Sequence, residues 1–514
     1  MKHILDRRKV STIRRVLIAN RGEIAVRIIR ACHEMGLSAV AVYSDADWDS
    51  PHVALADVAY RLGPAPATES YLHVERILEA AQQTGADAIH PGYGFLAENP
   101  DFAQACEEAG ILFVGPPAEV IRVLGDKSEA KRLMTTAGVP VVPGYFGADQ
   151  SNARLQREVR QLDLPLLIKA VAGGGGRGMR LVRTPEEFPG ALDEARREAR
   201  AAFGDDRLLL EHYIERPHHI EFQIFGDWQG NIAHLFEREC SIQRRHQKII
   251  EESPSPILTP ALRERMAEAA IRAGKAARYV NAGTVEFLLE ERPDGDHPFY
   301  FLEVNTRLQV EHPVTEAITG LDMVALQLRV ASGETLPFKQ EEINASGHAI
   351  EARIYAEDPA KGFLPSIGTL ACWMEPSGPG VRVDSGVQRG VQVSPFYDPL
   401  LAKLIVHADT RDAAQARLER ALKEFHVLGV QTNIAYLLDV ISHPAFRQGD
   451  TFTDFLSVHF PSWRPSSTVP TEVLLALAVE QWTHPAVRST QTINTGVEGD
   501  PYSPWRRATG WRNT

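Results

Sequence analysis

The chain has 514 residues, 44% of them hydrophobic and 24% charged, so it is too long for one hydrophobic core and about three domains are expected. This balance is typical of a soluble globular protein. A formal net charge of −12 argues against a general nucleic-acid binder, although a cleft that gathers Lys and Arg could still take an anionic substrate.

Cysteine spacing and apolar runs bear on location. Cys32, Cys106, Cys240 and Cys372 lie far apart with no C-x-x-C pair, which predicts neither a disulfide framework nor a structural zinc site and favours the cytoplasm. No stretch of about 18 apolar residues occurs, so no membrane span is expected. The basic start MKHILDRRKVSTIRR contains Asp6 and lacks an apolar core, which favours a short lead-in over a transit peptide.

Residues 1–126 are expected to form an α/β domain. RVLIAN, which starts at Arg15, predicts a strand, RGEIAVRIIRACHEMG predicts a helix closed by Gly36, and SAVAVYSD predicts a second strand. The rhythm continues through ADAIHPGYGFLAEN and ILFVGP, which indicates a parallel, Rossmann-like sheet with crossover helices. The first turn, NRGE, carries no G-x-G-x-x-G, so dinucleotide binding is not expected.

Residues 127–214 are expected to form a linker and a small lid domain. The strand-like segments LPLLIKA and MRLVR flank four glycines, Gly173 to Gly176. Glycines let backbone N–H groups approach a ligand closely, and Lys169 and Arg177 add positive charge, which together suit a polyphosphate. No G-x-x-x-x-G-K-[ST] occurs, so the loop is not a P-loop. The alternative is a flexible surface loop with unrelated charges.

Residues 215–460 are expected to form an antiparallel α+β body, from segments such as HIEFQIFGD, GTVEFLLE and HAIEARIYAED. In FLEVNTRLQVEHP, interpreted as one strand, polar residues fall on one face and mostly apolar residues on the other. The mixture of acids, amides and an arginine favours a functional face, with an ordinary solvated face as the alternative. The polar residues are Glu303, Asn305, Arg307, Gln309 and Glu311.

The strand before this segment predicts a metal site. GTVEFLLEERPDGDHPFYFLEV is expected to form a β-hairpin with Asp294 and Gly295 as a two-residue turn, which places Glu286 opposite Glu303. Two carboxylates in direct cross-strand register repel each other unless they are compensated. A divalent cation such as Mg²⁺ compensates them, and a salt bridge to a nearby Arg or Lys is the alternative.

A basic segment, ERECSIQRRHQKIIEE, is the third candidate. Such a density of cations and amides in an acidic protein suits phosphate and a small oxyanion, with a charged surface loop as the alternative. Farther along, Arg353 alternates with apolar residues, so it points into a cleft or pairs with Glu351 or Asp358. The polar residues of the basic segment are Arg238, Gln243, Arg244, Arg245, His246 and Lys248.

The remaining features are mostly negative. No H-E-x-x-H and no G-x-S-x-G occurs, so positioning and electrostatics are expected to carry the chemistry without a covalent enzyme nucleophile. Residues 461–514 change to PSWRPSSTVPTE, followed by one helical stretch, VLLALAVEQW, and are interpreted as a linker and docking tail.

Together these segments resemble biotin carboxylase, a member of the ATP-grasp superfamily. The matching phrases are IANRGEIAVRIIRA, HPGYGFLAEN, GDKSEAK, IKAVAGGGGRGM, ECSIQRRHQKIIEE and EVNTRLQVEHPVTE, and the resemblance covers roughly residues 14–458. It implies an ATP-grasp fold of mixed α/β and α+β class, with a Rossmann-like N-terminal domain, a glycine-rich lid and a C-terminal α+β domain.

The resemblance also implies roles for matching positions. Glu311 would be the general base, with bicarbonate held by Lys248, Arg307, Gln309 and backbone at Val310. Arg353 would face the developing enolate oxygen of biotin. Glu286 and Glu303 would bind Mg²⁺ or Mn²⁺, supported by Asn305. The nucleotide would contact Lys127, Lys169, Gly174, Gly175, Gly176, Glu211, His219, Gln243 and His246.

The implied reaction has two steps. Glu311 deprotonates bicarbonate, which attacks the γ-phosphorus of MgATP to give carboxyphosphate and ADP. Carboxyphosphate then releases CO₂, and the phosphate formed takes a proton from biotin, whose enolate captures the CO₂. The alternatives are another ATP-grasp ligase that joins a carboxylate to an amine, or a silent nucleotide-binding regulatory subunit.

The resemblance further implies partners. No Met-Lys-Met occurs, so the biotin is expected on a separate biotin carboxyl carrier protein unless the sequence is a fragment. The end, DPYSPWRRATGWR, resembles the start of the linking domain of long acyl-CoA carboxylase α subunits. Carboxyltransferase subunits of an acetyl-CoA or acyl-CoA carboxylase of fatty acid biosynthesis, and a homodimer, are therefore expected.

Overall fold

The computed structural model describes residues 12–172, 179–292, 295, 297–465, 475 and 479. The chain divides into two compact units, Met1–Arg464 and Pro465–Thr514, and the fold below is that of the first. The predicted glycine run and nearly all of the predicted tail lie outside the described residues. Within the described part of the chain, no helix has both the length and the apolar character needed to cross a membrane.

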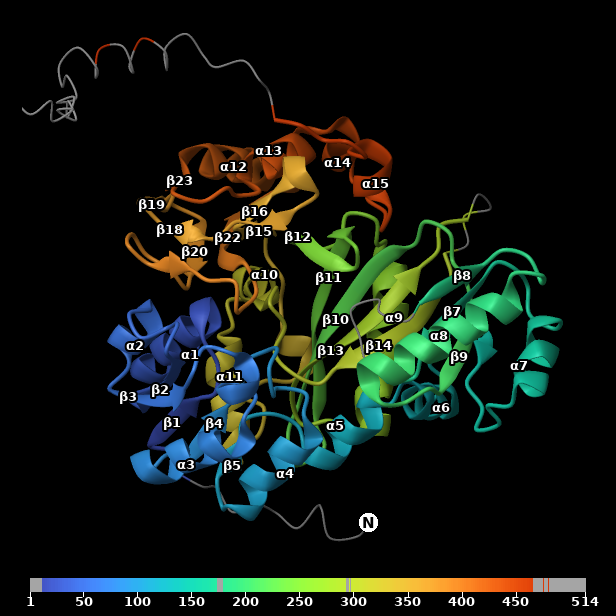
Figure 1. The fold of residues 1–514 in the computed structure, drawn as a ribbon, viewed down its shortest axis with the longest axis horizontal. Coiled ribbons are helices and arrows are strands. Elements are labelled where there is room, and N and C mark those ends of the chain that lie inside the picture. Colours follow the sequence, from blue (N-terminus) through green and yellow to red (C-terminus); the bar gives the residue numbers. More distant parts are fainter. Residues whose placement is uncertain are drawn as a thin grey trace, which may run out of the picture. The chain divides into compact units, whose positions relative to one another are not determined.

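The first domain contains a five-stranded parallel sheet, drawn in blue in Figure 1, as the sequence predicts. The strand order β3-β2-β1-β4-β5 places the first strand in the middle. Helices cover both faces of the sheet, which is why its strands are continuous apolar runs. The elements are β1 (Arg15–Ile18), α1 (Gly22–Glu34), β2 (Ser38–Ser44), α2 (Pro51–Leu55), β3 (Val58–Gly63), α3 (Val74–Thr84), β4 (Ala88–His90), α4 (Pro100–Glu108), β5 (Leu112–Phe113) and α5 (Ala118–Gly125).

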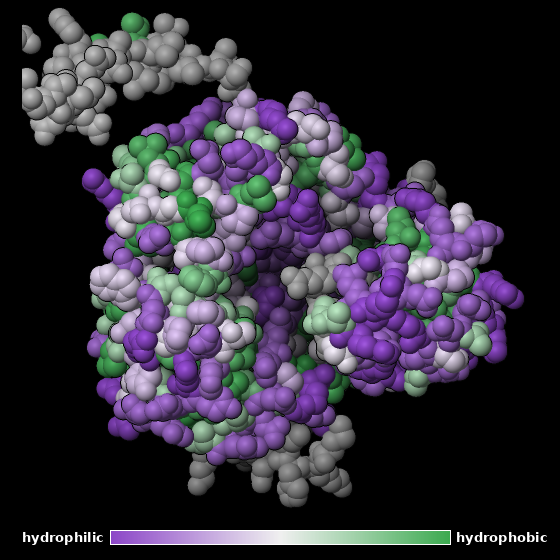
Figure 2. All heavy atoms as spheres, in the orientation of Figure 1, coloured by the Kyte–Doolittle hydropathy of each residue, from purple (hydrophilic) through white to green (hydrophobic). Residues whose placement is uncertain are grey.

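The lid is a separate four-stranded sheet of order β6-β9-β7-β8, packed on α8. Strands β7 and β8 pair antiparallel on either side of the glycine run, as predicted. Figure 2 shows a hollow between this lid and the rest of the first unit, and hydrophilic residues line the hollow. The elements are α6 (Lys127–Thr136), β6 (Gly144–Tyr145), α7 (Asn152–Val159), β7 (Leu166–Ala170), β8 (Arg180–Val182), α8 (Phe188–Phe203) and β9 (Leu208–His212).

An eight-stranded antiparallel sheet of order β14-β13-β10-β11-β12-β15-β22-β20 forms the body, which confirms the predicted antiparallel α+β class. Helix α9 packs on one half of the sheet and α12 with α13 on the other half. The elements are β10 (His218–Gly226), β11 (Ile232–Arg244), β12 (Gln247–Ser253), α9 (Pro260–Ala277), β13 (Asn281–Leu289), β14 (Phe299–Asn305), α10 (His312–Thr319), α11 (Met323–Ala331), β15 (His348–Tyr355), β20 (Val381–Ser385), β22 (Leu400–Ala408), α12 (Arg411–Glu424) and α13 (Ile434–Ser442).

Short elements complete the C-terminal part. They form three two-stranded sheets, β16-β17, β18-β21 and β19-β23, and two final helices. Their bounds are β16 (Glu357–Asp358), β17 (Leu364–Pro365), β18 (Gly368–Thr369), β19 (Cys372–Met374), β21 (Gln392–Val393), β23 (His426–Leu428), α14 (Pro444–Gln448) and α15 (Phe455–His459).

The hairpin of β13 and β14 pairs Glu286 with Glu303, which confirms the predicted register at that point. The predicted two-residue turn is wrong, because the strands end at Leu289 and start again at Phe299, so the connection is longer. Next to the connection the register differs by one residue from the predicted one, and a β-bulge between Glu286 and Phe287 restores it. The predicted pair therefore depends on a bulge that no turn rule anticipates.

Strand β14 also ends earlier than predicted, at Asn305. The segment that follows leaves the sheet and enters α10, whose first turn contains Pro313, a residue that fits a helix start. Arg307 and Glu311 therefore do not lie on a strand face, and the predicted continuous polar face is wrong. The segment instead folds back, so that its polar side chains meet those of the sheet.

Candidate active site

Lys248 lies at the centre of a cluster of buried carboxylates. Its Nζ is 2.5 Å from Glu221, 2.8 Å from Glu286 and 2.7 Å from Glu311. Lys248 lies on β12, Glu221 on β10 and Glu286 on β13. Glu311 directly precedes α10. Burial alone would lower the pKa of Lys248, but the three carboxylates hold it well above its usual range. The ammonium group is therefore charged at neutral pH.

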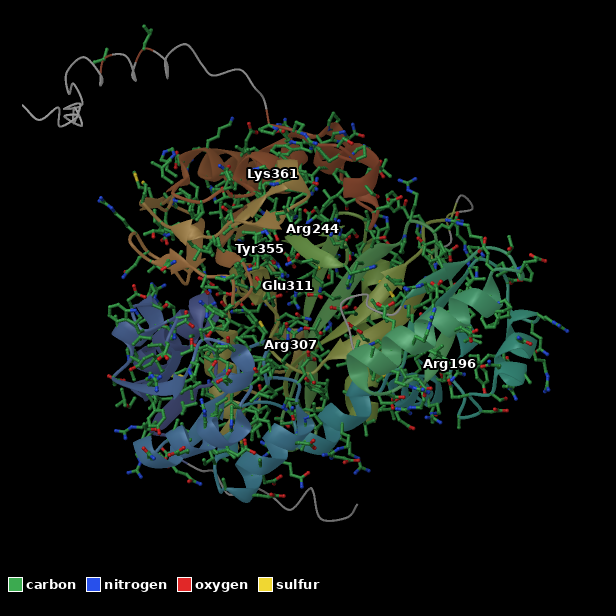
Figure 3. The ribbon with its side chains drawn as sticks, in the orientation of Figure 1. Arg196, Arg244, Arg307, Glu311, Tyr355 and Lys361 are labelled. Carbon is green, nitrogen blue, oxygen red and sulfur yellow. The ribbon has the colours of Figure 1, made fainter. Side chains whose placement is uncertain are left out.

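Glu311 is fully buried between two cations. Its Oε1 faces Lys248, and its Oε2 accepts a hydrogen bond of 2.9 Å from Arg353. Figure 3 places Glu311 between Tyr355 and Arg307 along the hollow. Burial would raise the pKa of Glu311, but the two cations hold it well below its usual range. The carboxylate is ionised, and it becomes a stronger base when a ligand draws these cations away.

Glu286 and Glu303 form the predicted carboxylate pair. Glu286 is already held by His219, whose Nε2 lies 3.0 Å from Oε2, and by Asn305, whose Nδ2 donates at 2.9 Å to Oε1. Glu303 has Lys127 at 3.7 Å. Burial and the charge of Glu286 raise the pKa of Glu303. Their repulsion is the condition that a hard divalent cation relieves, so these residues fit a magnesium site, which stays a prediction.

Arg307 is fixed by three side-chain oxygens. It donates to Glu98 at 2.9 Å, to Gln309 at 2.9 Å and to Asn305 at 3.1 Å. Because Asn305 in turn donates to Glu286, these residues join the carboxylate pair to the segment before α10 in one hydrogen-bonded network. A network of this kind holds a guanidinium in one orientation at the edge of the hollow.

A second charged cluster lies on the lid side. Glu211 on β9 is 2.5 Å from Lys169 on β7 and 2.6 Å from Lys131 on α6. Glu211 is buried, which would raise its pKa, but the two lysines lower the pKa to about 2. The carboxylate therefore stays ionised and keeps the ammonium groups of Lys131 and Lys169 together. In the sequence, Lys169 shortly precedes the predicted nucleotide loop.

Acid should destabilise this cluster. The pKa of Glu211 is about 2 in the folded protein against 4.5 for an ordinary glutamate, so its stabilising contribution is complete above 4.5 and is lost as the pH falls towards 2. The contribution is on the order of 3 kcal/mol. We expect the Tm of the unmodified chain to exceed that of Glu211→Gln at neutral pH, and the gap to narrow in acid. A gap that does not change with pH would contradict this assignment.

The tip of the β11–β12 hairpin brings His246 towards both clusters. Arg245 and His246 have φ values of 50° and 66°, so they form a tight two-residue turn between Arg244 and Gln247. Partial burial lowers the pKa of His246, and its neighbours Lys169 and His219 lower it further. His246 is therefore neutral at physiological pH and can accept or donate one hydrogen bond to a ligand.

The basic segment does not act as a single cluster. Arg238 is fully buried and pairs with Glu221 at 2.5 Å, so it supports the site from inside the sheet. Arg244 pairs with Glu357 at 3.0 Å and stacks on Phe363. Of the predicted residues, only Gln243, His246 and Lys248 remain for the site. Gln243 lies 3.4 Å from Nδ1 of His219.

A cavity of about 460 Å³ opens beside Arg353 and Arg307. Tyr93 of the first domain and Tyr355 and Phe396 of the C-terminal part contribute to its wall. Aromatic walls with a few convergent polar groups suit a small ring system with polar edges. Arg353 does not pair with Glu351 or Asp358, and the cleft alternative holds for this residue.

The structure brings most predicted residues together and adds others that the sequence did not reveal. Glu221 lies on β10 directly opposite Arg238, which the sequence had singled out in the basic segment, so the pairing of the two strands is the signal that could have revealed Glu221. Lys131 follows Lys127 by one helical turn, which was a weaker signal. Gly174, Gly175 and Gly176 lie outside the described residues. The residues missed are Glu98, Lys131, Glu221 and Glu251.

Three family models match the chain in succession. They are biotin carboxylase N-terminal domain at residues 12–121, the ATP-binding domain of carbamoyl-phosphate synthase L chain at 126–339, and biotin carboxylase C-terminal domain at 351–458. Biotin carboxylase from Halalkalibacterium halodurans is 53% identical over 446 residues, which cover 87% of this chain and 98% of that protein. The chain belongs to the biotin carboxylase family.

Solved structures agree with this assignment. The biotin carboxylase domain dimer of 2-oxoglutarate carboxylase from Hydrogenobacter thermophilus, in complex with MgADP, ADP and bicarbonate, has a TM-score of 0.85 and 47% identity over 89% of this chain and all of that chain. Biotin carboxylase from Campylobacter jejuni, in complex with a β,γ-ATP compound, has a TM-score of 0.84 and 44% identity over 87% of this chain and 99% of that chain. The fold is therefore the ATP-grasp fold of biotin carboxylases.

A longer relative shares the same region. The alpha subunit of mitochondrial methylcrotonoyl-CoA carboxylase from Mus musculus is 51% identical over 470 residues, which are 91% of this chain. The chain spans only 65% of the length of that relative. Members of the biotin carboxylase family thus occur both as short proteins and as parts of longer polypeptides.

Proposed function

We propose that the chain carboxylates biotin held by a biotin carboxyl carrier protein, with ATP and bicarbonate as the other substrates. The observation that carries this proposal is the position of Glu311, an ionised buried carboxylate between Lys248 and Arg353. Arg353, which contacts Glu311, also lines the cavity of about 460 Å³, so a base, a cation for an anion and a cavity for a ring system would lie next to one another. ATP-dependent carboxylation of biotin needs all three in one place.

Lys248, Arg307 and Gln309, with the backbone at Val310, would hold bicarbonate. As bicarbonate takes up hydrogen bonds from Lys248, fewer remain for Glu311, so the pKa of Glu311 rises towards that of a working base. Glu311 then removes the bicarbonate proton, and a bicarbonate oxygen attacks the γ-phosphorus of ATP. ADP leaves, and the proton stays on Glu311.

Lys127, Lys169, Glu211, His219, Gln243 and His246, with the glycines of the lid loop, would contact the nucleotide. Mg²⁺ or Mn²⁺ would be held by Glu286 and Glu303 with support from Asn305, and would neutralise charge on the phosphates when bound. The lid domain beside the hollow would exclude water, which protects a labile carboxylated phosphate.

Arg353 would act on biotin in the second step. Its guanidinium lines the cavity and stays charged at any working pH, because the pKa of Arg353 lies well above its usual range through the nearby acids. Negative charge grows on the biotin carbonyl oxygen as the ureido nitrogen loses its proton, and a fixed cation beside that oxygen lowers the barrier.

The final acceptor is a separate proposal. Relatives named as biotin carboxylase, as the alpha chain of methylcrotonoyl-CoA carboxylase and as one component of pyruvate carboxylase match the same region, so the shared half-reaction says little about the acceptor. We propose an acyl-CoA, acetyl-CoA in a fatty acid pathway among them, carboxylated by partner carboxyltransferase subunits. A homodimer in the cytoplasm remains our expectation.

Release of ADP with MgATP and bicarbonate, with and without free biotin, tests the half-reaction. We expect biotin to stimulate ADP release. ADP release that is the same with and without biotin would indicate another ATP-grasp ligase, one that joins a carboxylate to an amine. No ADP release would indicate a nucleotide-binding regulatory subunit.

A further inference from the structure

A row of buried charges lies on one face of the body sheet, behind the proposed base. Glu251 on β12 is directly opposite Glu351 on β15, Arg353 on β15 is opposite Lys403 on β22, and Asp384 on β20 is also opposite Lys403. Residues opposite each other in a sheet share a face, and so do residues two apart on one strand. The five side chains therefore form one group, each at most 7% exposed.

This arrangement is costly unless the charges are paired. The alternate residues of β15, Ile350, Ala352 and Ile354, pack into the apolar core under α12 and α13, so the charged face cannot turn to solvent. A buried charge without a partner costs several kcal/mol, and two buried carboxylates in direct register repel each other. Each of the three carboxylates of this group therefore needs a cation or a proton to balance it.

The two opposed glutamates differ in their contacts. Glu251 holds Arg353: its Oε1 accepts from Nε at 2.7 Å and lies 2.5 Å from a terminal nitrogen of the same guanidinium. Neither oxygen of Glu351 has a hydrogen-bond partner among the described residues. Burial raises the pKa of Glu351 well above its usual range, and the charges of Glu251 and Glu311 add to this. Burial also raises the pKa of Glu251, to about 7, and the guanidinium of Arg353 opposes that rise. Only one of the pair serves as an anchor.

Arg353 therefore has two carboxylate contacts of different kinds. One is to Glu311, the proposed base, at 2.9 Å, and the other is to Glu251. When Glu311 takes a proton it loses its negative charge and most of its attraction for Arg353. Glu251 touches no other cation of the site in the described structure and keeps its contact.

We propose that Glu251 is a positioning residue, which holds the guanidinium of Arg353 at the cavity wall while Glu311 changes its protonation state. The inference rests on the proposed function. A guanidinium is a rigid planar fork with five N–H donors, so a carboxylate that fixes one edge also fixes the direction of the other donors. Arg353 lines the cavity in which the biotin oxyanion is proposed to form.

A matched pair of variants tests the proposal: Glu251→Gln and Glu351→Gln. Both remove a fully buried carboxyl from the same cross-strand position, but only the first removes an anchor of Arg353. We expect kcat for biotin-stimulated ADP release to fall about tenfold or more in Glu251→Gln, because a misdirected donor loses its effect on the transition state. The KM for ATP should stay within about twofold, and Glu351→Gln should stay within about twofold of the unmodified chain in both constants.

Glu251→Asp is a second variant, for the case in which Glu251→Gln does not fold. It keeps the charge with a shorter reach, and we expect a kcat between those of Glu251→Gln and the unmodified chain, so the same comparison can be made if Glu251→Gln cannot be purified. Equal kcat in the Glu251 and Glu351 variants, or a rise in the KM for ATP that accounts for the loss, would overturn the inference alone. Absence of biotin stimulation in the unmodified chain would overturn the proposed function as well.

Discussion

Replacing Glu311 by glutamine is expected to reduce biotin-stimulated ADP release by about 100-fold to 10,000-fold, the range for loss of a general base. Glutamine has nearly the same size as glutamate, and its one amide oxygen can accept a hydrogen bond from Lys248 or from Arg353 but not from both. It cannot accept the bicarbonate proton. The variant should therefore fold and still bind nucleotide. Steady-state ADP release with MgATP, bicarbonate and biotin measures the effect.

Glu316→Gln is the matched control. Glu316 is a buried carboxylate on the helix that starts after Glu311, and it pairs with Arg27 and Arg382 away from Lys248. We expect its ADP release to stay within about threefold of the unmodified chain, because it lies outside the network that holds the base. Similar losses in the two variants would mean that Glu311 supports the fold and is not the base.

Replacing Lys248 by methionine is expected to have the largest effect on stability. The ammonium compensates Glu221, Glu286 and Glu311 at once, and removing one partner of a buried ion pair costs about 3–5 kcal/mol. Loss of the ammonium should raise the pKa values of Glu286 and Glu311, which are now below the usual value, and should raise further that of Glu221, which already lies above it. The stability loss is then greatest near neutral pH. It should lessen as the pH falls and the carboxyls take up protons, and also in strong alkali, where Lys248 of the unmodified chain itself loses its proton.

Thermal unfolding over a range of pH, compared with Lys361→Met, tests this prediction. Lys361 has a side chain that is 74% exposed and pairs only with Asp358 in the described residues, so its loss should cost less than about 1 kcal/mol. A Lys248→Met variant as stable as Lys361→Met would show that the carboxylates do not depend on the lysine.

Local periodicity predicted the first domain well, because each strand and helix there follows from apolar runs and helical spacing of nearby residues. The same reasoning failed after Asn305, where the sequence keeps alternating but the chain leaves the sheet. Pro313 lies in the first turn of α10, where a proline fits, and the helix forms there although the alternation of polar and apolar residues favours a strand. Polar alternation alone therefore cannot distinguish a strand face from a segment that folds over a site.

The positions of site residues relative to one another were predicted where the residues lie close together in the sequence, as for the pairing of Glu286 with Glu303. It was missed where partners come from distant strands. Glu251 holds Arg353 across 102 residues of sequence, and Glu98 holds Arg307 across 209. Nothing local in either segment specifies such a pairing, because it depends on the order of strands in the eight-stranded sheet and on the contact between domains.

The most direct test of the central claim is the transfer of radiolabelled carbon from bicarbonate to free biotin by the purified chain with MgATP. We expect acid-labile label on biotin that requires ATP and is lost in the Glu311→Gln variant. ADP formed without any label on biotin, from a folded and nucleotide-binding chain, would contradict it.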